Sequence, residues 1–320
     1  MRRAWRRPSR SSRPRKRRPT PKVPTVRRRT PPDSADDRVP DSAPDTARPL
    51  IATAASSRWR TVEHRRLVDS TQDVARALVA AGRPMGIVAL ADGQMRGRGR
   101  RGRHWTDHHV TADGRPANLA ASFAVPATGQ GAPTVPLALV PFAAGLAIVD
   151  TLAGFDLTAA LKWPNDVLVG DDKVAGILVE RHTVRLDAGD PDVPAGDGHI
   201  DVVIVGCGVN LDWRAIAGGD DAPRAWTSLA EVAGASFDRD EVFARLADAL
   251  DHTLALDGAE VRRRYRRHCD TLGRQVRVEL PDGAVHVGRA HDVDDAGRLG
   301  IEPSGHWLHA ADVVHLRPDA

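Results

Sequence analysis

From Trp59 onward, the chain alternates between segments in which apolar residues recur every second position and segments in which they recur every three to four. Short apolar runs bounded by Gly, Pro or Asp predict strands. These runs occupy residues 60–68, 87–91, 118–125, 159–163, 166–169, 173–181 and 201–206. The helical period covers residues 70–81, 137–154, 238–255 and 258–268. Strands and helices are interspersed without a regular βαβ repeat, so the pattern predicts an α+β fold with a mixed sheet and flanking helices.

Local signals refine this outline. Ser70 or Thr71 is expected to cap the first helix. The helix that follows Pro141 is apolar on all sides, which predicts that it is buried. This stretch is shorter than the roughly 20 apolar residues that cross a bilayer, so we expect no membrane segment. Residues 187–199 are rich in Asp, Gly and Pro and predict a flexible hairpin tip.

The pattern changes at Thr271, where short strands with Gly-containing turns begin. These strands are expected at 275–280, 284–293, 298–302 and 307–316. Short antiparallel strands in this number predict a small β-barrel. We therefore expect three parts, a leader (1–50), a larger domain (57–270) and a C-terminal barrel (271–320).

Charge is divided unevenly along the chain. Lys and Arg total 46 against 42 Asp and Glu, but residues 1–50 hold 16 against 5, so the remainder holds 30 against 37. The leader is rich in Pro, Ser and Arg and is disordered by composition. It is either a tether for nucleic acid or an acidic surface, or a nonessential extension, or the product of a start codon set too early, and we favour the last two.

Cysteine content bears on the compartment. Cys207 and Cys269 are too few for a disulfide framework or a metal cluster, which indicates a reducing cytoplasm. No apolar segment follows the N-terminal arginines, so we expect no secretory signal. Cys207 lacks any marked His–Asp partner and is expected to be a small core residue rather than a nucleophile.

The run GRGRRGRHW at residues 97–105 carries the strongest chemical signal. Glycines allow a backbone to approach a ligand closely, and arginines supply forked cationic donors suited to phosphate. The closing Trp105 can stack on a flat ring or anchor the loop. The alternative, an RNA-binding tail, fits less well because apolar segments flank the run on both sides.

Three further segments carry polar chemistry, and each also has a purely structural interpretation. Ser70-Thr71-Gln72 begins a helix, where free N–H groups bind polar ligands, but a plain N-cap has the same composition. A hairpin tip at 170–172 would bring Asn165 and Asp166 near Lys173, either as an ion pair or as a phosphate site. In the segment GCGVN at 206–210, glycines permit close approach of a ligand, or simply form a bulge.

Together and in this order, GRGRRGRHW, KWPND, KVAGILVE and GCGVN resemble the catalytic core of biotin protein ligases. The resemblance covers about residues 60–270. It implies a catalytic domain like that of class II aminoacyl-tRNA synthetases, followed by an SH3-like barrel. It also implies an ATP-dependent ligase that forms biotinyl-5′-AMP with Mg²⁺ and transfers biotin to a lysine of a biotin carboxyl carrier domain.

The resemblance assigns roles to matching residues. It implies that Lys173, Arg98 and Arg100 are catalytic. Biotin would be bound by Ser70, Thr71, Gln72, Gln94, Arg98, Gly176 and Gly206. ATP or the adenylate would be bound by Arg98, Arg100, Arg103, Trp105, Asn165, Lys173, Asn210 and Trp226. Asp166 is a candidate metal ligand. The family usually has Asn where this chain has Gln72, which leaves the contact of that residue open.

Other readings stay open beside this one. A lipoate–protein ligase would share the fold and the adenylation chemistry, although its RRxSGGG-type signature is missing. A nucleic-acid-binding regulator would use the leader and the Gly/Arg run, and a catalytically dead binding module is a third option. Proline is scattered through residues 1–50, which excludes a helix-turn-helix there and implies the single-function form of the family. The sequence leaves both a monomer and a homodimer open.

Overall fold

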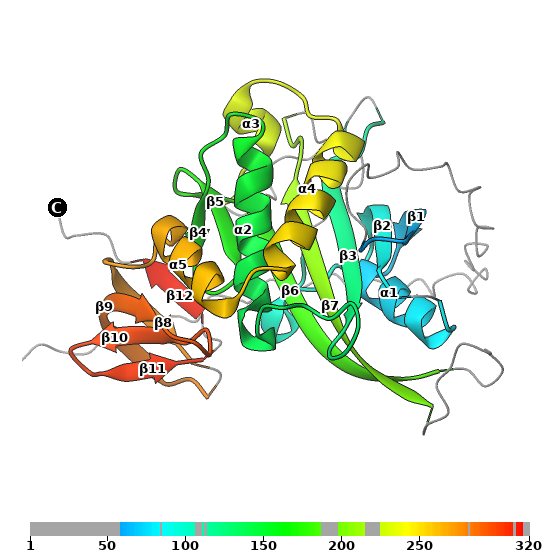
Figure 1. The fold of residues 1–320 in the computed structure, drawn as a ribbon. Coiled ribbons are helices and arrows are strands. Elements are labelled where there is room, and N and C mark those ends of the chain that lie inside the picture. Colours follow the sequence, from blue (N-terminus) through cyan, green and yellow to red (C-terminus); the bar gives the residue numbers. More distant parts are fainter. Residues whose placement is uncertain are drawn as a thin grey trace, which may run out of the picture. The chain divides into compact units, whose positions relative to one another are not determined.

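The structure is a computed structural model that describes residues 58–83, 85–105, 111, 114–186, 198–214, 225–280, 282–309 and 312–315. The predicted leader at 1–50 lies outside the described residues, as does most of the predicted hairpin tip at 187–199. Two sheets and five α-helices make up the described part of the chain (Figure 1).

The larger sheet has seven strands in the order β1-β2-β3-β7-β6-β5-β4. They are β1 (Thr61–Val68), β2 (Ile87–Gln94), β3 (Asn118–Pro126), β4 (Ala160–Lys162), β5 (Asp166–Val169), β6 (Asp172–Arg185) and β7 (His199–Asn210). Strands β1 and β2 run parallel, and every other neighbouring pair runs antiparallel. The sheet is therefore mixed, as the pattern predicted.

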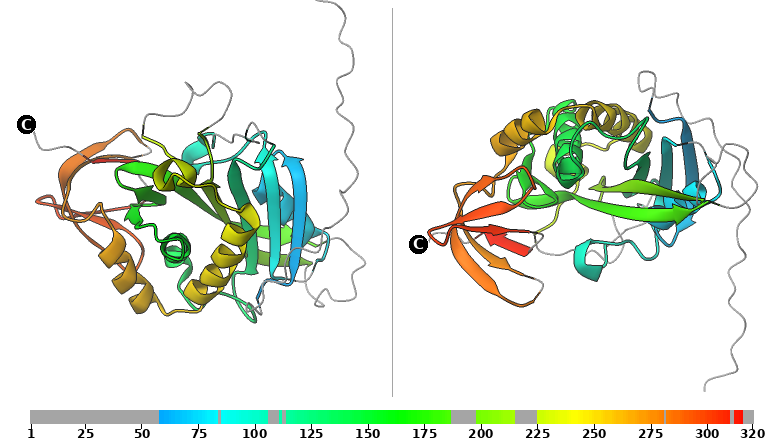
Figure 2. Two further views of the ribbon diagram at one scale, coloured as in Figure 1. Left: turned by 90° about the horizontal axis from the view of Figure 1, so that it is seen from above. Right: turned by 60° about the horizontal axis from the view of Figure 1, so that its bottom comes forward.

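Helices cover both faces of this sheet. Alternate residues of β2 point to opposite faces, and Val88 and Leu90 join one apolar core while Ile87 and Ala89 join another. The first core contains residues of α2 (Val140–Ala153), α4 (Arg239–Leu254) and α5 (Gly258–His268), and the second those of α1 (Thr71–Ala80). Figure 2 shows α2, α4 and α5 together on one side of the sheet.

Helix α2 is the central helix of the first core. All but three of its 14 residues are buried, which confirms the buried helix predicted after Pro141. The predicted helix over 137–154 is divided, because a 3₁₀ turn η2 (Leu137–Leu139) precedes it. Gly145 lets the helix approach the sheet closely, since a Cβ there would lie 2.9 Å from Cδ2 of Leu161.

The C-terminal segment forms a separate five-stranded antiparallel sheet in the order β11-β10-β9-β8-β12. Its strands are β8 (Gln275–Glu279), β9 (Val285–Val293), β10 (Leu299–Glu302), β11 (His306–Leu308) and β12 (Asp312–His315). The single strand predicted over 307–316 is wrong. Because β11 pairs with β10 and β12 pairs with β8, the chain has to leave one edge of the sheet to reach the other.

Polar contacts from Arg266 and Trp163 are among those that tie this smaller sheet to the rest. Arg266 of α5 makes a two-pronged ion pair with Asp292 of β9, with atoms 2.5 and 2.7 Å apart. Nε1 of Trp163 donates to the carbonyl of Gly297 at 3.0 Å. Both contacts join elements far apart in sequence. Among the described residues, none of the helices has the length and apolar character needed to cross a bilayer.

Helix termini differ from the predicted capping in one place. Ser70 is the N-cap residue of α1, which confirms its predicted position, but its side chain makes no capping hydrogen bond. Its Oγ is buried beside a cavity instead. The short helix α3 (Leu229–Ala233), which the sequence did not predict, begins with a complete capping box formed by Ser228 and Glu231.

Candidate active site

A cavity of about 200 Å³ lies where the start of α1, the Gly/Arg loop, the β4–β5 connection and the central strands meet. Fourteen of the fifteen residues predicted for the site line it. They are Ser70, Thr71, Gln72, Gln94, Arg98, Arg100, Arg103, Trp105, Asn165, Asp166, Lys173, Gly176, Gly206 and Trp226. Asn210 is the exception.

Glycines form the floor of the cavity. Gly176 of β6 pairs in register with Gly208 of β7, and Gly206 pairs with Ser122 of β3. A Cβ on Gly176 or Gly208 would lie 2.6 or 2.7 Å from the ring of Trp105. These two positions need glycine because the indole rests directly on the strand backbones.

The start of α1 forms a polar end. Oε1 of Gln94 accepts hydrogen bonds from N of Thr71 at 2.9 Å and from its Oγ1 at 3.2 Å. Gln72 donates through Nε2 to the carbonyl of Leu178 at 2.9 Å. Oγ of Ser70 and Oε1 of Gln72 are buried and have no hydrogen-bond partner in the protein. Buried polar atoms of this kind cost about 1–3 kcal/mol each unless a ligand satisfies them, which indicates a polar ligand group here.

The Gly/Arg loop is folded over the cavity. N of Gly99 donates to the carbonyl of Arg103 at 2.7 Å, and N of Trp105 donates to that of Gly97 at 2.8 Å. A 3₁₀ turn η1 (Arg100–Gly102) forms the tip, where Gly102 has a φ of +71°. This small hairpin carries the Trp105 ring inward, so that only 7% of the residue is exposed.

Lys173 lies opposite the loop. Its Nζ is 2.6 Å from Oδ1 of Asp166, so the predicted proximity and the ion pair are both present. The same Nζ lies 4.8 and 5.3 Å from the ring centroids of Trp226 and Trp105. Arg100 donates through Nη1 to Oδ1 of Asn165 at 3.2 Å. A lysine, a carboxylate and an arginine thus meet within one small cavity.

Trp226 is fixed beside Lys173 by main-chain pairing. N of Lys173 donates to the carbonyl of Ala225, and N of Thr227 donates to the carbonyl of Lys173, both at 2.9 Å. Nδ2 of Asn210 donates to the carbonyl of Thr227 at 2.8 Å. Asn210 is fully buried and is not among the residues that line the cavity, and its predicted contact with the adenylate stays a prediction. Its side chain supports the segment that carries Trp226.

A third tryptophan extends the aromatic wall. The ring of Trp213 stacks on that of Trp226 with centroids 6.1 Å apart and planes 19° apart, and Trp226 in turn lies 5.1 Å from Trp105. Nε1 of Trp213 donates to Oδ1 of Asn118 at 2.8 Å. The sequence alone did not mark this residue, because it follows the GCGVN segment in a stretch without a clear period.

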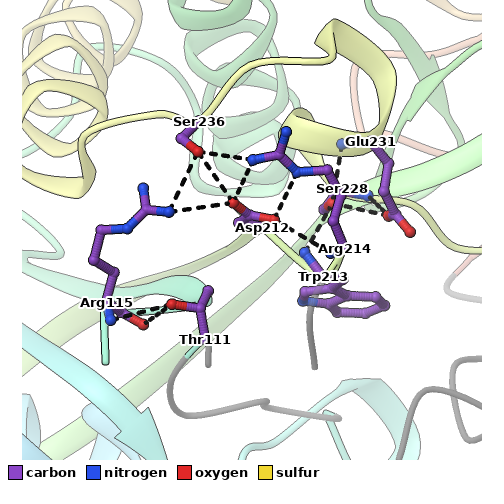
Figure 3. A network of polar contacts seen from close by, with 8 residues as sticks. All are labelled: Thr111, Arg115, Asp212, Trp213, Arg214, Ser228, Glu231 and Ser236. Atoms are coloured by element: carbon purple, nitrogen blue, oxygen red, sulfur yellow. Dashed lines mark hydrogen bonds and ion pairs between the residues drawn. The ribbon is translucent and has the colours of Figure 1, made fainter. Parts of the chain in front are cut away.

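The residue that precedes Trp213 in the chain is Asp212, a buried carboxylate at the centre of a network of polar contacts (Figure 3). Asp212 accepts hydrogen bonds from Nε of Arg214 at 3.0 Å and from its Nη2 at 2.7 Å, and it lies 3.7 Å from Arg115. Ser236 contacts both Asp212 and Arg214. The hydrogen bonds from Arg214 hold the pKa of the Asp212 carboxyl below its usual value, although burial opposes this shift. The Asp212–Arg214 ion pair therefore stays ionised around neutral pH. Because Trp213 lies between these two residues in the chain, the ion pair restrains its backbone.

Two further lining residues follow from strand geometry. Oγ of Ser122 in β3 lies 2.8 Å from Oγ1 of Thr71, and Ser122 is, with Asn118, one of two polar residues in this strand. Cys207 is 2% exposed, and burial raises the pKa of its thiol to about 12. The expectation that Cys207 is a core residue is confirmed, since a thiol with this pKa stays protonated and unreactive.

Comparison with known proteins agrees with this geometry. Residues 65–188 match the biotin/lipoate A/B protein ligase family, and residues 271–316 match the biotin protein ligase C-terminal domain. The chain is 33% identical to a biotin–[acetyl-CoA-carboxylase] ligase of Mycobacterium tuberculosis over 276 residues, which cover 82% of this chain and 92% of the relative. It is 34% identical to the ligase of that name from Paracoccus denitrificans over 237 residues, 70% of this chain and 88% of the relative.

The fold is also found among solved structures. Biotin protein ligase from Aquifex aeolicus, in complex with biotin and ATP, superposes with a TM-score of 0.62. It is 23% identical, and the match covers 81% of this chain and all of that one. The sheet with flanking helices and the small C-terminal sheet are therefore the fold of that protein. With the identity to the Mycobacterium tuberculosis ligase over nearly its whole length, this chain belongs to the biotin protein ligases.

Proposed function

We propose that this protein activates biotin with ATP to form biotinyl-5′-AMP and transfers the biotinyl group to a lysine of a biotin carboxyl carrier domain. One observation carries the proposal: Lys173 and Arg100 converge on a cavity with a polar end at α1 and an aromatic wall at Trp105 and Trp226. The polar end suits the flat, polar ring system of biotin, and the aromatic wall suits the purine of ATP.

The polar end suits the ureido group of biotin. Ser70, Thr71, Gln72 and Gln94 supply hydroxyl and amide groups there, and two of these atoms are buried without a protein partner. Gly176 and Gly206 leave space beside them on the strand floor, and Gln72 is the neighbour that a Cβ on Gly206 would meet, at 2.8 Å. The longer Gln72 thus remains within the polar end.

The first step joins two anions. An oxygen of the biotin carboxylate attacks the α-phosphorus of ATP, the bond to the β-phosphate oxygen breaks, and pyrophosphate leaves. Cations preorganised around this point stabilise the charge of the transition state. Lys173 is the central cation in this proposal, and Arg100 and Arg103 of the facing loop line the same cavity. Arg98 lies at the rim, where carboxylates pair with it.

The second step needs no covalent enzyme intermediate. The lysine nitrogen of the carrier attacks the acyl carbon of the mixed anhydride, AMP leaves, and the amine loses a proton. A loop that covers the anhydride protects it from water until the carrier arrives. We assign the adenylate to the wall formed by Trp105, Trp226 and Asn165, with Asn210 as a support of Trp226.

In this proposal, Mg²⁺ enters the site bound to the phosphates of ATP. Magnesium is commonly held by one or two carboxylates plus substrate phosphates, and Asp166 is a carboxylate on the cavity wall. Among the described residues, no group of three or more His, Cys, Asp or Glu could hold a metal without such phosphates. Asp166 would therefore supply one ligand to an ion that neutralises the triphosphate. The domain limits at 57–270 and 271–320, a homodimer and a cytoplasmic location stay predictions.

The test is incubation of the protein with ATP, a biotin carrier domain and either biotin or lipoate. We expect the mass of one biotinyl group on the carrier lysine, and no gain with lipoate. A gain with lipoate alone would replace biotin by the other substrate of the matched family. Loss of nucleic-acid retention on removal of residues 1–50, without any carrier modification, would favour the regulator instead.

A further inference from the structure

Two carboxylates from different elements hold the guanidinium of Arg98. Its Nη2 lies 3.2 Å from Oδ1 of Asp73 in the first turn of α1, and 3.3 Å from Oε2 of Glu180 in β6. The two acids are 107 positions apart in the chain, and both pair with the same Nη2 of Arg98. Arg98 is therefore the point at which the Gly/Arg loop is fastened to its surroundings.

The pairing changes what Arg98 can contribute electrostatically. Its single positive charge faces two negative charges, so the cluster adds no net positive potential to the cavity. Arg100, the next arginine but one in the loop, lines the cavity and donates to the amide of Asn165.

We infer that Asp73 and Glu180 are positioning residues that close the Gly/Arg loop through Arg98, and that Arg98 acts as a clasp rather than as a cation for the reacting groups. Arg98 forms a β-bridge with His104, next to Trp105 in the loop hairpin. Fixing Arg98 therefore fixes the indole over the cavity floor. The inference rests on the proposed function where it names biotinyl-5′-AMP as the molecule retained.

The neighbours of the two acids make the clasp reversible. Nη2 of Arg76 lies 3.2 Å from the same Oδ1 of Asp73, and Nε2 of His182 lies 3.6 Å from Oε2 of Glu180. Arg76 belongs to α1 and His182 to β6, so both stay beside their acids when the loop moves away. The acids then keep a nearby cationic or polar group, and each ion pair to Arg98, being partly exposed, is modest in strength. A loop that must reopen for the carrier needs such a weak, divided attachment.

The first test uses the ligand-free protein and does not depend on any substrate. Hydrogen–deuterium exchange is followed over residues 95–105 in Asp73→Asn, Glu180→Gln and the double variant. We expect exchange to rise about two- to five-fold in each single variant, the factor for loss of one partly exposed ion pair, and further in the double variant. Exchange equal to wild type in the double variant would overturn the clasp.

Two matched controls separate the clasp from general charge effects. Arg76→Gln removes the other cation on Oδ1 of Asp73 but leaves Arg98 paired, so exchange of the loop should not rise. Asp69→Asn removes a longer, exposed pair to Arg96 of 3.9 Å, at the start of the loop, and should also leave exchange unchanged. A rise of similar size in either control would show that any lost charge loosens the loop and would refute the assignment.

The second test measures the retained intermediate. Dissociation of preformed biotinyl-5′-AMP should be several-fold faster in Asp73→Asn, Glu180→Gln and Arg98→Gln. In the two acid variants, single-turnover pyrophosphate release at saturating substrates should fall by less than about three-fold. Arg98→Gln combined with the two acid variants should add little, because all three act through one cluster. Adenylation reduced about 100-fold by Arg98→Gln alone, with unchanged dissociation, would make Arg98 a cation for the reaction and overturn the inference. If wild-type protein forms no adenylate, the proposed function fails, while the exchange experiment still decides the clasp.

Discussion

Lys173 occupies a position in which three kinds of interaction meet. A carboxylate lies 2.6 Å from its ammonium group, two indole rings lie beside it, and its backbone pairs with the segment that carries Trp226. Each of these contacts restricts where the ammonium can point. A cation held in place stabilises the charge of a transition state more than a mobile one does, because it needs little reorganisation during the reaction.

Replacing Lys173 by Ala should therefore lower the rate of adenylation by on the order of 10²- to 10³-fold, the effect of losing one preorganised donor. Pyrophosphate release in a single turnover measures this step. The Lys173→Arg variant keeps the positive charge but moves it, so it serves as a control. We expect it to recover only part of the rate, because the position of the charge matters as well as its sign. Near wild-type release from Lys173→Ala would remove the residue from the mechanism.

A substitution at Gly208 tests whether the floor of the cavity has to be glycine. A Cβ there would lie 2.7 Å from Cζ2 of Trp105, so Gly208→Ala has to displace the indole. We expect the Kd for ATP to rise about ten-fold, with a small change in thermal midpoint because the ring can move into the cavity. Isothermal titration measures the Kd. In a Trp105→Ala background the same substitution should have little further effect, and a full effect there would contradict this explanation.

At the scale of elements, the Gly/Arg loop is the part of the site that has to move. It is fastened by ion pairs of Arg98 and by main-chain hydrogen bonds within its own hairpin. Three glycines in seven residues make its ordering costly in entropy. A bound adenylate supplies further contacts that offset this cost.

Protease cleavage within residues 97–103 should therefore slow on addition of biotin and ATP. The expected change is about ten-fold at saturating ligand, and quantitative mass spectrometry of the cleavage products measures it. Cleavage elsewhere in the chain serves as the internal control. Equal rates with and without the two ligands would mean that the loop does not order around the intermediate.

At the scale of the whole molecule, the smaller sheet supports the active-site segment KWPND. N of Trp163 donates to Oγ1 of Thr271 at 3.0 Å, and the same oxygen lies 3.0 Å from Nε2 of His315 in β12. Burial lowers the pKa of His315 to about 4, and the charge of Lys162 acts in the same direction. His315 is therefore neutral at pH 7 and shares a hydrogen bond with the Thr271 hydroxyl.

The sign of the pH dependence follows from this depressed pKa. The unfolded chain takes up a proton on His315 below about 6.5, whereas the folded protein does so only near 4, so stability falls as pH decreases through that window. The thermal midpoints at pH 7.5 and 5.0 measure the loss. His315→Gln, which keeps a hydrogen-bonding side chain without a proton to gain, should reduce this loss by about 2 kcal/mol. An identical pH dependence in the variant would exclude His315 as its source.

Several features of the fold were already determined by the sequence. The period of apolar residues located most strands and the main helices because the burial of each residue follows from its side within one element. The four motifs, in their order, brought fourteen of fifteen predicted residues to one cavity. The motifs predict site residues because close approach of a ligand requires glycine and binding of phosphate requires cations. Both requirements hold in any fold.

The tertiary structure alone decided the contacts between distant segments. Asp73 and Glu180 meet on Arg98, Trp163 meets Gly297, and Trp213 extends the wall behind Trp226. Asn210 at the end of β7 is buried and donates to the carbonyl of Thr227, a contact that no local pattern indicates. These outcomes depend on strand register and on the path of the chain between sheets. A local period sets which side of an element is buried, but it carries no information about which other element will lie against that side.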